Sequence, residues 1–202
     1  MHIAVSGNIA SGKTTLTRML AKAYGWTPYF ETGDNPYLAD YYADMPRWSF
    51  NTQVHFLAKR LRDTSEIGRT AGYVIQDRTI YEDAHVFARN LRQRQLMSQR
   101  DYDCYSQLFR LLTDRLPLPD LLIYLRGSVA TLAKRIQQRG RSYEQGISLG
   151  YLQGLGDLYE EWIAQYPGKH IIIDADRYQF ASSSKDFLSV TEQIDGLLFG
   201  LF

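Results

Sequence analysis

The segment that most restricts the fold of this chain lies near its beginning and reads Gly7-Asn8-Ile9-Ala10-Ser11-Gly12-Lys13-Thr14-Thr15. Its first eight residues match the pattern G-x-x-x-x-G-K-[ST], with a strand-like run before them and a helical pattern after them. Glycines let the backbone wrap around an anion, while N–H groups and the helix N-terminus supply positive potential. In such a loop Lys13 bridges the β- and γ-phosphates of a nucleotide, and the Thr14 hydroxyl reaches Mg²⁺. The segment predicts an ATP-type phosphate site on a strand–loop–helix unit.

Short apolar runs alternate with longer helical patterns along the 202 residues. Two of these runs, 120–125 and 170–174, are almost continuously apolar, which is typical of parallel strands covered on both faces. The alternation predicts an α/β fold of three layers, with about five parallel strands flanked by helices, in one domain covering 1–202. The expected strands are 2–6, 27–31, 72–77, 120–125 and 170–174, and the expected helices are about 13–24, 36–44, 47–70, 80–95, 100–115, 128–138, 148–165 and 186–199.

The net charge of +1 provides no general field to attract a nucleic acid polymer or an anionic membrane, so a small anion must be held by local charges. There is no leader-like beginning and no apolar stretch long enough for a membrane span, which favours a cytoplasmic protein. The single cysteine, Cys104, excludes an intramolecular disulfide, and we expect it to be a buried or half-buried small hydrophobic residue on a helix.

Asp77 follows an apolar strand-like run and precedes Arg78. A carboxylate at the carboxyl end of a strand lies beside the crevice where open α/β sheets bind ligands, and there it can hold Mg²⁺ directly or through water. The alternative is that Asp77 caps a helix beginning at Thr79. The adjacent Arg78 favours the functional role of Asp77 in metal binding over its role as a cap.

A basic run over 134–141 places Arg135 and Arg139 one helical turn apart, on the same face of a predicted helix. Gly140 is expected to end that helix and let Arg141 turn back toward the same ligand. Arginine suits a phosphoryl group because its planar fork can donate two hydrogen bonds. A solvated basic face is the alternative, but a chain with a phosphate loop favours a phosphate-binding lid.

Several blocks of the chain, in the same order, resemble the deoxynucleoside kinases nearly end to end, and the bacterial deoxyadenosine/deoxyguanosine kinases most. One departure is Glu31-Thr32-Gly33, where similar enzymes often have Glu-Pro, which leaves the local backbone open. The blocks are 7–15, Glu31, Asn35-Pro36-Tyr37-Leu38, 47–53 with Phe56-Leu57 and Arg60, Asp77-Arg78-Thr79-Ile80-Tyr81-Glu82-Asp83, 119–125, 135–141, Glu144-Gln145-Gly146-Ile147 and Tyr151-Leu152.

This resemblance implies that Glu31 accepts the proton of the attacking 5′-hydroxyl and that Arg78 steadies the 5′-oxygen and the transferred group. Because phosphoryl transfer passes through a loose transition state, Glu31 is expected to orient the hydroxyl more than to act as a strong base. Lys13, Arg135 and Arg139 complete the implied catalytic set. Without the resemblance, Glu31 reads as an exposed charge at a strand end.

The resemblance also assigns the nucleoside contacts. Tyr42 and Glu144 hold the sugar 3′-hydroxyl, while Gln53, Arg60 and Asp83 face the base, with an Arg60–Asp83 pair suited to a purine or cytosine. Gln53 and Arg60 are two helical turns apart, so a polar stripe on an amphipathic helix is the alternative.

The aromatic residues are harder to assign. Tyr41, Tyr102 and Tyr159 are interpreted as packing residues, and Phe50 or a neighbour either lines the base pocket or belongs to the core. The 174–180 segment resembles the family's loop over the adenine of ATP.

The expected enzyme transfers the γ-phosphate of ATP, with Mg²⁺, to a deoxynucleoside in nucleotide salvage. Deoxyadenosine and deoxyguanosine are favoured and deoxycytidine is possible, and the resemblance implies a homodimer. Two alternatives stay open: a nucleoside monophosphate kinase similar to thymidylate kinase, and a kinase-like accessory subunit without activity.

Overall fold

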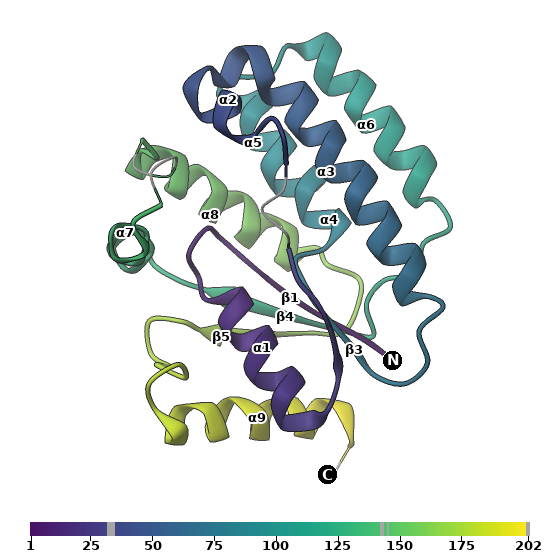
Figure 1. Cartoon of the computed structure of the whole chain (residues 1–202), viewed down its shortest axis with the longest axis vertical. Helices are drawn as coiled ribbons and strands as arrows, with labels where there is room; N and C mark the ends of the chain where they lie inside the picture. The colour runs from purple at the N-terminus through teal and green to yellow at the C-terminus, as the bar shows by residue number, and fades with distance from the viewer. Residues whose placement is uncertain (32–34, 142–143, 145, 201–202) are drawn as a thin grey trace.

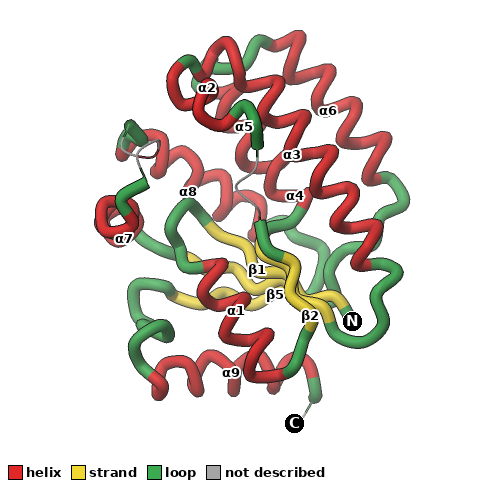
Figure 2. Tube along the Cα trace, in the orientation of Figure 1, coloured by secondary structure: helices red, strands yellow, loops and turns green. Residues whose placement is uncertain are grey.

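The computed structural model describes residues 1–31, 35–141, 144 and 146–200, and it contains a five-stranded parallel sheet. The order of the strands is β2-β3-β1-β4-β5, with β1 in the centre (Figures 1 and 2). The predicted parallel α/β sheet is therefore confirmed. The strands are β1 (His2–Gly7), β2 (Thr27–Tyr29), β3 (Val74–Asp77), β4 (Leu121–Arg126) and β5 (His170–Asp174).

Helices cover both faces of this sheet. The long helices on one face are α1 (Lys13–Tyr24) and α9 (Ser184–Leu198), and the larger helical layer lies on the other face (Figure 1). Within that layer are α2 (Leu38–Ala43), α3 (Met45–Ile67), α4 (Ile80–Glu82), the π-helix η1 (Asp83–Ala88), α5 (Arg89–Gln93), α6 (Gln99–Thr113), α7 (Val129–Arg139) and α8 (Leu149–Ala164).

Alternation of side chains along β1 divides the core between the two faces. Ile3 and Val5 pack in one cluster with Leu16 of α1 and Ile194 of α9, while Ala4 packs in the other with Leu155 of α8. All six side chains are fully buried, because both faces of a parallel sheet must be covered. This two-sided burial explains why the apolar runs in the sequence are nearly continuous.

Several element boundaries differ by a few residues from those predicted, and two differences bear on the site. The second strand ends at Tyr29, so Glu31 follows it as part of the chain leaving the sheet. The single helix expected over 80–95 consists of α4, η1 and α5, with one π-helical segment in the middle. A π-helix is rare and has no periodic signature in sequence, and it occurs often at functional sites.

The prediction for Cys104 is wrong, because the thiol is exposed on α6. The buried face of this helix is carried by Tyr105 and Phe109, which pack with Leu57 of α3. Cys104 therefore lies off the packed face. Within the described ranges, no helix combines the length and the apolar composition needed to cross a bilayer.

Candidate active site

A cavity of about 490 Å³ opens at the carboxyl end of the sheet, between the phosphate loop, the larger helical layer and α7. Its size is in the range of small-molecule sites. Most of the predicted site residues meet in its wall, although they come from widely separated segments of the chain. The predicted residues that line it are Ile9, Ala10, Gly12, Lys13, Thr14, Thr15, Glu31, Tyr42, Gln53, Arg78, Asp83, Arg135, Arg139, Arg141 and Glu144.

The phosphate loop is closed around the ammonium group of Lys13. This group donates to the carbonyl oxygens of Gly7 and Asn8, at 2.9 Å in each case. Gly7 has φ +148°, and a Cβ there would lie 2.7 Å from the backbone oxygen of Leu125. Burial, followed by the nearby charge of Arg78, lowers the pKa of Lys13 to about 8. Lys13 therefore faces the cavity as a buried cation at neutral pH.

Thr14 and Asp77 form the part of the site that fits a divalent cation. The Thr14 hydroxyl donates to Oδ2 of Asp77 at 2.5 Å, and buried Oδ1 has no hydrogen-bond partner among the described residues. The N-cap of α4 is Thr79, so the alternative role of Asp77 as that cap is wrong. The described ranges contain no cluster of three His, Cys, Asp or Glu residues that could hold a metal ion. One carboxylate and one hydroxyl beside a phosphate loop match a Mg²⁺ that takes its other ligands from phosphates and water.

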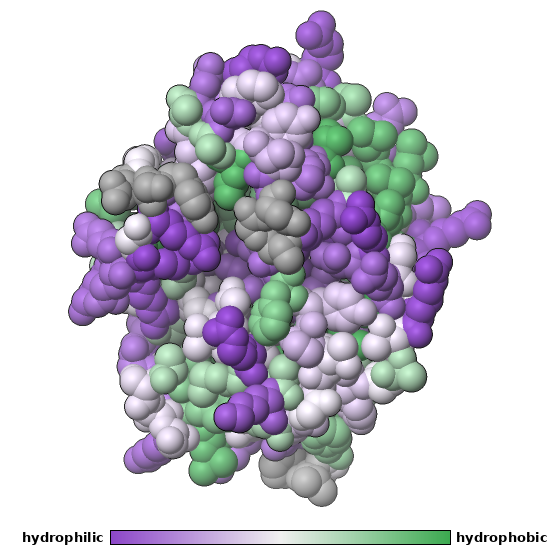
Figure 3. Space-filling view, viewed as in Figure 1, coloured by the Kyte–Doolittle hydropathy of each residue, from purple (hydrophilic) through white to green (hydrophobic). Residues whose placement is uncertain are grey.

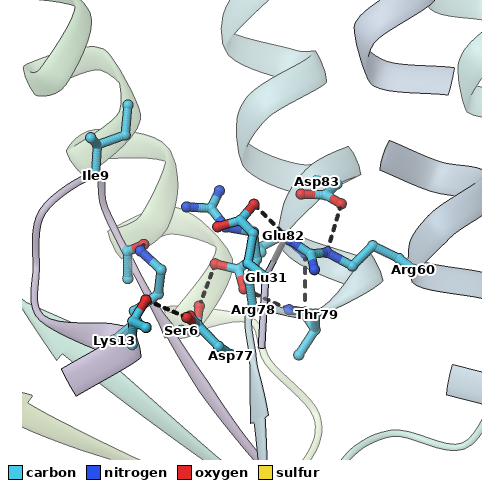
Figure 4. A network of polar contacts seen from close by, with 12 residues as sticks. Ser6, Ile9, Lys13, Glu31, Arg60, Asp77, Arg78, Thr79, Glu82 and Asp83 are labelled. Atoms are coloured by element: carbon cyan, nitrogen blue, oxygen red, sulfur yellow. Dashed lines mark hydrogen bonds and ion pairs between the residues drawn. The ribbon is translucent and has the colours of Figure 1, made fainter. Parts of the chain in front are cut away.

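Glu31 lies between two arginines at the next part of the cavity (Figure 4). Arg60 Nη2 donates to Glu31 Oε1 at 2.8 Å, and Arg78 Nε lies 3.3 Å from Oε2. Burial alone would raise the pKa of Glu31, but Arg78, Arg60 and Lys13 lower it to about 2. Glu31 is thus ionised at neutral pH and a weak base, a better acceptor for a hydrogen bond than for a proton.

Asp83 and Gln53 form a polar end of the cavity. Arg60 Nε lies 3.4 Å from Asp83 Oδ2, so the expected Arg60–Asp83 pair is present. Burial raises the pKa of Asp83 to about 7, against the opposing effect of Arg60 and Arg78. Oε1 of buried Gln53 has no hydrogen-bond partner among the described residues. Arg60 is 1% exposed and supports the two carboxylates without lining the cavity itself.

The basic segment after β4 lies over the phosphate loop. Arg135 donates to the backbone oxygens of Ser11 at 2.9 Å and Ala175 at 2.8 Å. Arg139 pairs with buried Glu144 through both carboxylate oxygens, and Arg141 lies 3.4 Å from the same group. All three arginines line the cavity, which contradicts a purely solvated basic face.

Gly140 ends α7 in a left-handed conformation with φ +66°, as the sequence predicted. The Thr32-Gly33 departure from the family pattern lies outside the described residues, so its effect on the backbone stays open.

Several cavity residues were given no site role from sequence, although Leu38, Thr52, Phe56 and Tyr151 lie in blocks that resemble the family. Phe87 lies one turn after Asp83, and Phe56 lies one turn after Gln53, so helical spacing from a predicted polar residue could have indicated both. Tyr41, interpreted above as a packing residue, also lines the cavity, whereas Phe50 packs against the Leu57–Phe109 cluster. The remaining lining residues missed by that reasoning are Leu38, Thr52, Tyr151 and Ala181, and the 174–180 segment contributes Tyr178, Gln179 and Phe180.

Comparison with known proteins points to one family. The sequence profile of the family described as deoxynucleoside kinase matches residues 3–198. A deoxyadenosine/deoxycytidine kinase of Bacillus subtilis is 36% identical over 200 residues, which cover 97% of this chain and 92% of the relative. A deoxyguanosine kinase of the same organism is 32% identical, with 97% of each chain covered.

Solved structures of a deoxyadenosine kinase from M. mycoides share the fold. The structure with dCMP and dCDP bound superposes with a TM-score of 0.86 at 28% identity, covering 97% of this chain and 100% of the other. The structure with bound dATP has the same TM-score and identity. The match of the profile over almost the whole chain, together with these relatives, establishes that this chain belongs to the deoxynucleoside kinase family and is a deoxynucleoside kinase.

Proposed function

We propose that this enzyme transfers the γ-phosphate of Mg²⁺-bound ATP to the 5′-hydroxyl of a purine deoxynucleoside, with deoxyadenosine as the first substrate. Residues 1–202 form one catalytic domain in this proposal. The observation that carries it is one continuous cavity in which Lys13 marks the phosphate end, Glu31 the middle and Asp83 the base end. ATP and nucleoside would thus meet at Glu31.

At the phosphate end, Lys13 contacts the β- and γ-phosphates, and the N–H groups of the loop bind their oxygens. Thr14 and Asp77 would hold Mg²⁺, which neutralises phosphate charge during transfer. Arg135, Arg139 and Arg141 donate to phosphate oxygens from above and exclude water. For Arg139 this requires that Glu144 find another partner, and the 3′-hydroxyl of the sugar, held with Tyr42, is that partner.

At the acceptor, Glu31 accepts the hydrogen bond of the 5′-hydroxyl and directs its lone pair toward the γ-phosphorus. A carboxylate with a pKa of about 2 is a poor base, so its main contribution is orientation. The proton passes from the hydroxyl to the Glu31 carboxylate late, when the new P–O bond has made that oxygen acidic and the P–O bond to ADP is breaking. Arg78 stabilises the charge on the transferred group.

At the base end, the buried acceptors favour a base that carries an exocyclic amino group. Gln53 Oε1 has no hydrogen-bond partner among the described residues, and Asp83 Oδ2 is held by its ion pair with Arg60 at 3.4 Å and makes no hydrogen bond to them. Adenine and cytosine each present an amino group there, whereas guanine presents a carbonyl oxygen that must turn toward the amide of Gln53 or toward Arg60. Deoxycytidine is therefore a side substrate and deoxyguanosine a slower one.

The test is a steady-state panel of the four deoxynucleosides and adenosine with ATP. We expect the highest kcat/KM for deoxyadenosine and a loss of about 10²–10⁴-fold for a nucleoside lacking the 3′-hydroxyl, since buried Glu144 would then be unpaired. Faster turnover of thymidine than of any other substrate would contradict the assignment of the base end.

Competition between deoxyadenosine and its monophosphate tests the alternative of a nucleoside monophosphate kinase. The acceptor side of the cavity carries the carboxylates Glu31 and Glu144, which would repel the phosphate of a nucleoside monophosphate. We expect that the monophosphate is not phosphorylated and that it binds more weakly than deoxyadenosine. No ATP consumption with any nucleoside would instead revive the accessory-subunit hypothesis.

We also propose that the enzyme is a homodimer that associates through α6. Leu108, Leu111 and Leu112 are exposed on this helix at one-turn spacing. An apolar surface lies at the upper right of Figure 3, where Figure 1 places α6. Contiguous apolar surface of this kind marks interaction sites. Leu111→Asp should convert a dimer into a monomer in sedimentation equilibrium and increase the labelling rate of Cys104. Leu188→Asp, at an exposed position of α9, is the matched control, and a monomeric wild-type enzyme would refute the dimer. A cytoplasmic location stays a prediction.

A further inference from the structure

The carboxylate of Glu82 is fully buried and joins three elements of the fold. Oε1 accepts the backbone N–H of Thr79 at 2.7 Å. Oε2 accepts the hydroxyl of Ser6 at 2.8 Å and that of Tyr159 at 2.6 Å. These donors belong to the turn after β3, to β1 and to α8, and Glu82 lies between Ser6 and Thr79 in Figure 4. Burying an acidic side chain among three neutral donors costs free energy, which indicates that the position of Glu82 matters to the protein.

The turn that Glu82 holds contains Arg78 in a strained conformation. Arg78 has φ +70°, which side chains other than glycine rarely adopt, and its N–H donates to Val5 of β1 at 2.9 Å. Such a residue persists only where its surroundings fix it. Glu82 supplies that constraint directly, because it binds the N–H of the next residue and forms a capping box with Thr79.

The same carboxylate is also connected to the guanidinium of Arg78 through two packed aromatic rings. That guanidinium lies 4.3 Å from the centre of the Phe87 ring. The ring of Tyr159 meets Phe87 edge-on at 6.3 Å, and the Tyr159 hydroxyl donates to Glu82. Glu82 thus restrains Arg78 at its backbone and behind its head group, while its bond to Ser6 fixes the residue that precedes the phosphate loop.

We propose that Glu82 is a positioning residue for the transfer step: it holds Arg78 at a fixed place relative to the phosphate loop, without touching either substrate. This inference rests on the proposed function for the role of Arg78. Because Glu82 lies behind the cavity wall, its loss should affect the geometry of the transition state much more than the binding of ATP or nucleoside.

The first test is Glu82→Gln, which keeps the shape but replaces one accepting oxygen with an NH₂ group that cannot accept a hydrogen bond. We expect kcat to fall about 10- to 100-fold, while KM for ATP and for deoxyadenosine stays within about 3-fold, the pattern of an interaction realised in the transition state. Tyr159→Phe removes one donor and should lower kcat about 2- to 10-fold. Tyr166→Phe is the matched control, because Tyr166 belongs to the same buried cluster and its hydroxyl has no hydrogen-bond partner among the described residues.

The second test separates positioning from a general structural role by a double-mutant cycle with Arg78→Ala. If Glu82 acts through Arg78, Glu82→Gln should cost no further kcat in the Arg78→Ala background. Equal losses of kcat in both backgrounds, or a lower Tm with unchanged kcat, would overturn the inference. Should Glu82→Gln fail to fold, Tyr159→Phe decides the same cycle.

The two proposals fail in different ways. Full kcat in Arg78→Ala alone would refute the role of Arg78 in the proposed function, and this inference with it. A large loss in Arg78→Ala combined with normal kcat in Glu82→Gln would refute only the role of Glu82.

Discussion

Arg60 of α3 donates to Glu31 at 2.8 Å, although Glu31 lies 29 residues earlier in the chain, beyond the end of β2. The same guanidinium lies 3.4 Å from Asp83 of η1. One buried cation therefore links the carboxylate in the middle of the cavity to the carboxylate at its base end. Because both carboxylates pair with this cation, a change of charge at one end of the cavity should alter the electrostatics at the other.

Glu31→Gln should lower kcat by about 10²–10⁴-fold, since the amide still reaches the hydroxyl but loses the charge that orients it. Because the pKa of Glu31 is about 2, the wild-type kcat should show no titration of this group between about pH 4 and pH 8. Rate measurements over that range, with saturating ATP and deoxyadenosine, check both points. Unchanged kcat in the variant would contradict the proposed role.

Asp83 should make the folded protein less stable as the pH rises toward neutrality. Its pKa is raised to about 7, so between the unfolded value and 7 the folded state binds more protons than the unfolded state. The contribution is favourable below that window and is lost as the pH rises through it, by at most about 1.4 kcal/mol per pH unit.

Asp83→Asn should remove this dependence, because the amide stays neutral at every pH. The free energy of unfolding in urea, measured at several pH values from 4 to about 8, checks the prediction. Equal slopes against pH in the two proteins would show that Asp83 is already ionised at low pH in the folded state. Tyr166→Phe serves again as a buried control without a change of charge.

Thr14→Val should raise the Mg²⁺ concentration needed for half-maximal rate and lower kcat about 10- to 100-fold, since one oxygen ligand is lost. Asp77→Asn should act in the same direction, whereas Thr15→Val should have a much smaller effect on Mg²⁺ dependence. Titration of the rate with Mg²⁺ at fixed ATP distinguishes these outcomes. If the Mg²⁺ dependence of Thr14→Val and of Asp77→Asn were the same as that of Thr15→Val, the cation would have to bind elsewhere.

Gly7→Ala should destabilise the protein and weaken ATP binding, because its Cβ would lie 2.7 Å from the backbone oxygen of Leu125. With φ at +148° the new residue is strained as well, and the loss should be about 2 kcal/mol or more. Gly25→Ala is the matched control: φ is +68°, the space around it is open, and the cost should stay near 1 kcal/mol. Thermal unfolding with and without ATP measures both effects.

Much of the fold follows from local patterns in the sequence. The glycine-rich segment 7–14 identifies β1 and α1, and the continuous apolar run 120–125 identifies a strand buried on both faces. The boundaries are less secure, as the early end of β2 shows, because a strand ends where its neighbour stops pairing. The exposure of Cys104 also depends on which face of α6 packs, and a small residue beside Tyr105 can lie on either side.

The sequence was enough to predict the phosphate loop, the parallel architecture and, through resemblance, most of the residues that meet in the cavity. The contacts that connect these residues could be read only from the folded chain: Arg60 to Glu31, Asp83 in a π-helix, Phe87 under Arg78 and Glu82 between three elements. Periodicity reports which side chains of one element share a face. Contacts between distant elements, and the pKa values that follow from them, arise only when packing brings those faces together and removes water from between them. For the phosphate loop, whose ligands are successive residues of one turn, the local sequence was sufficient.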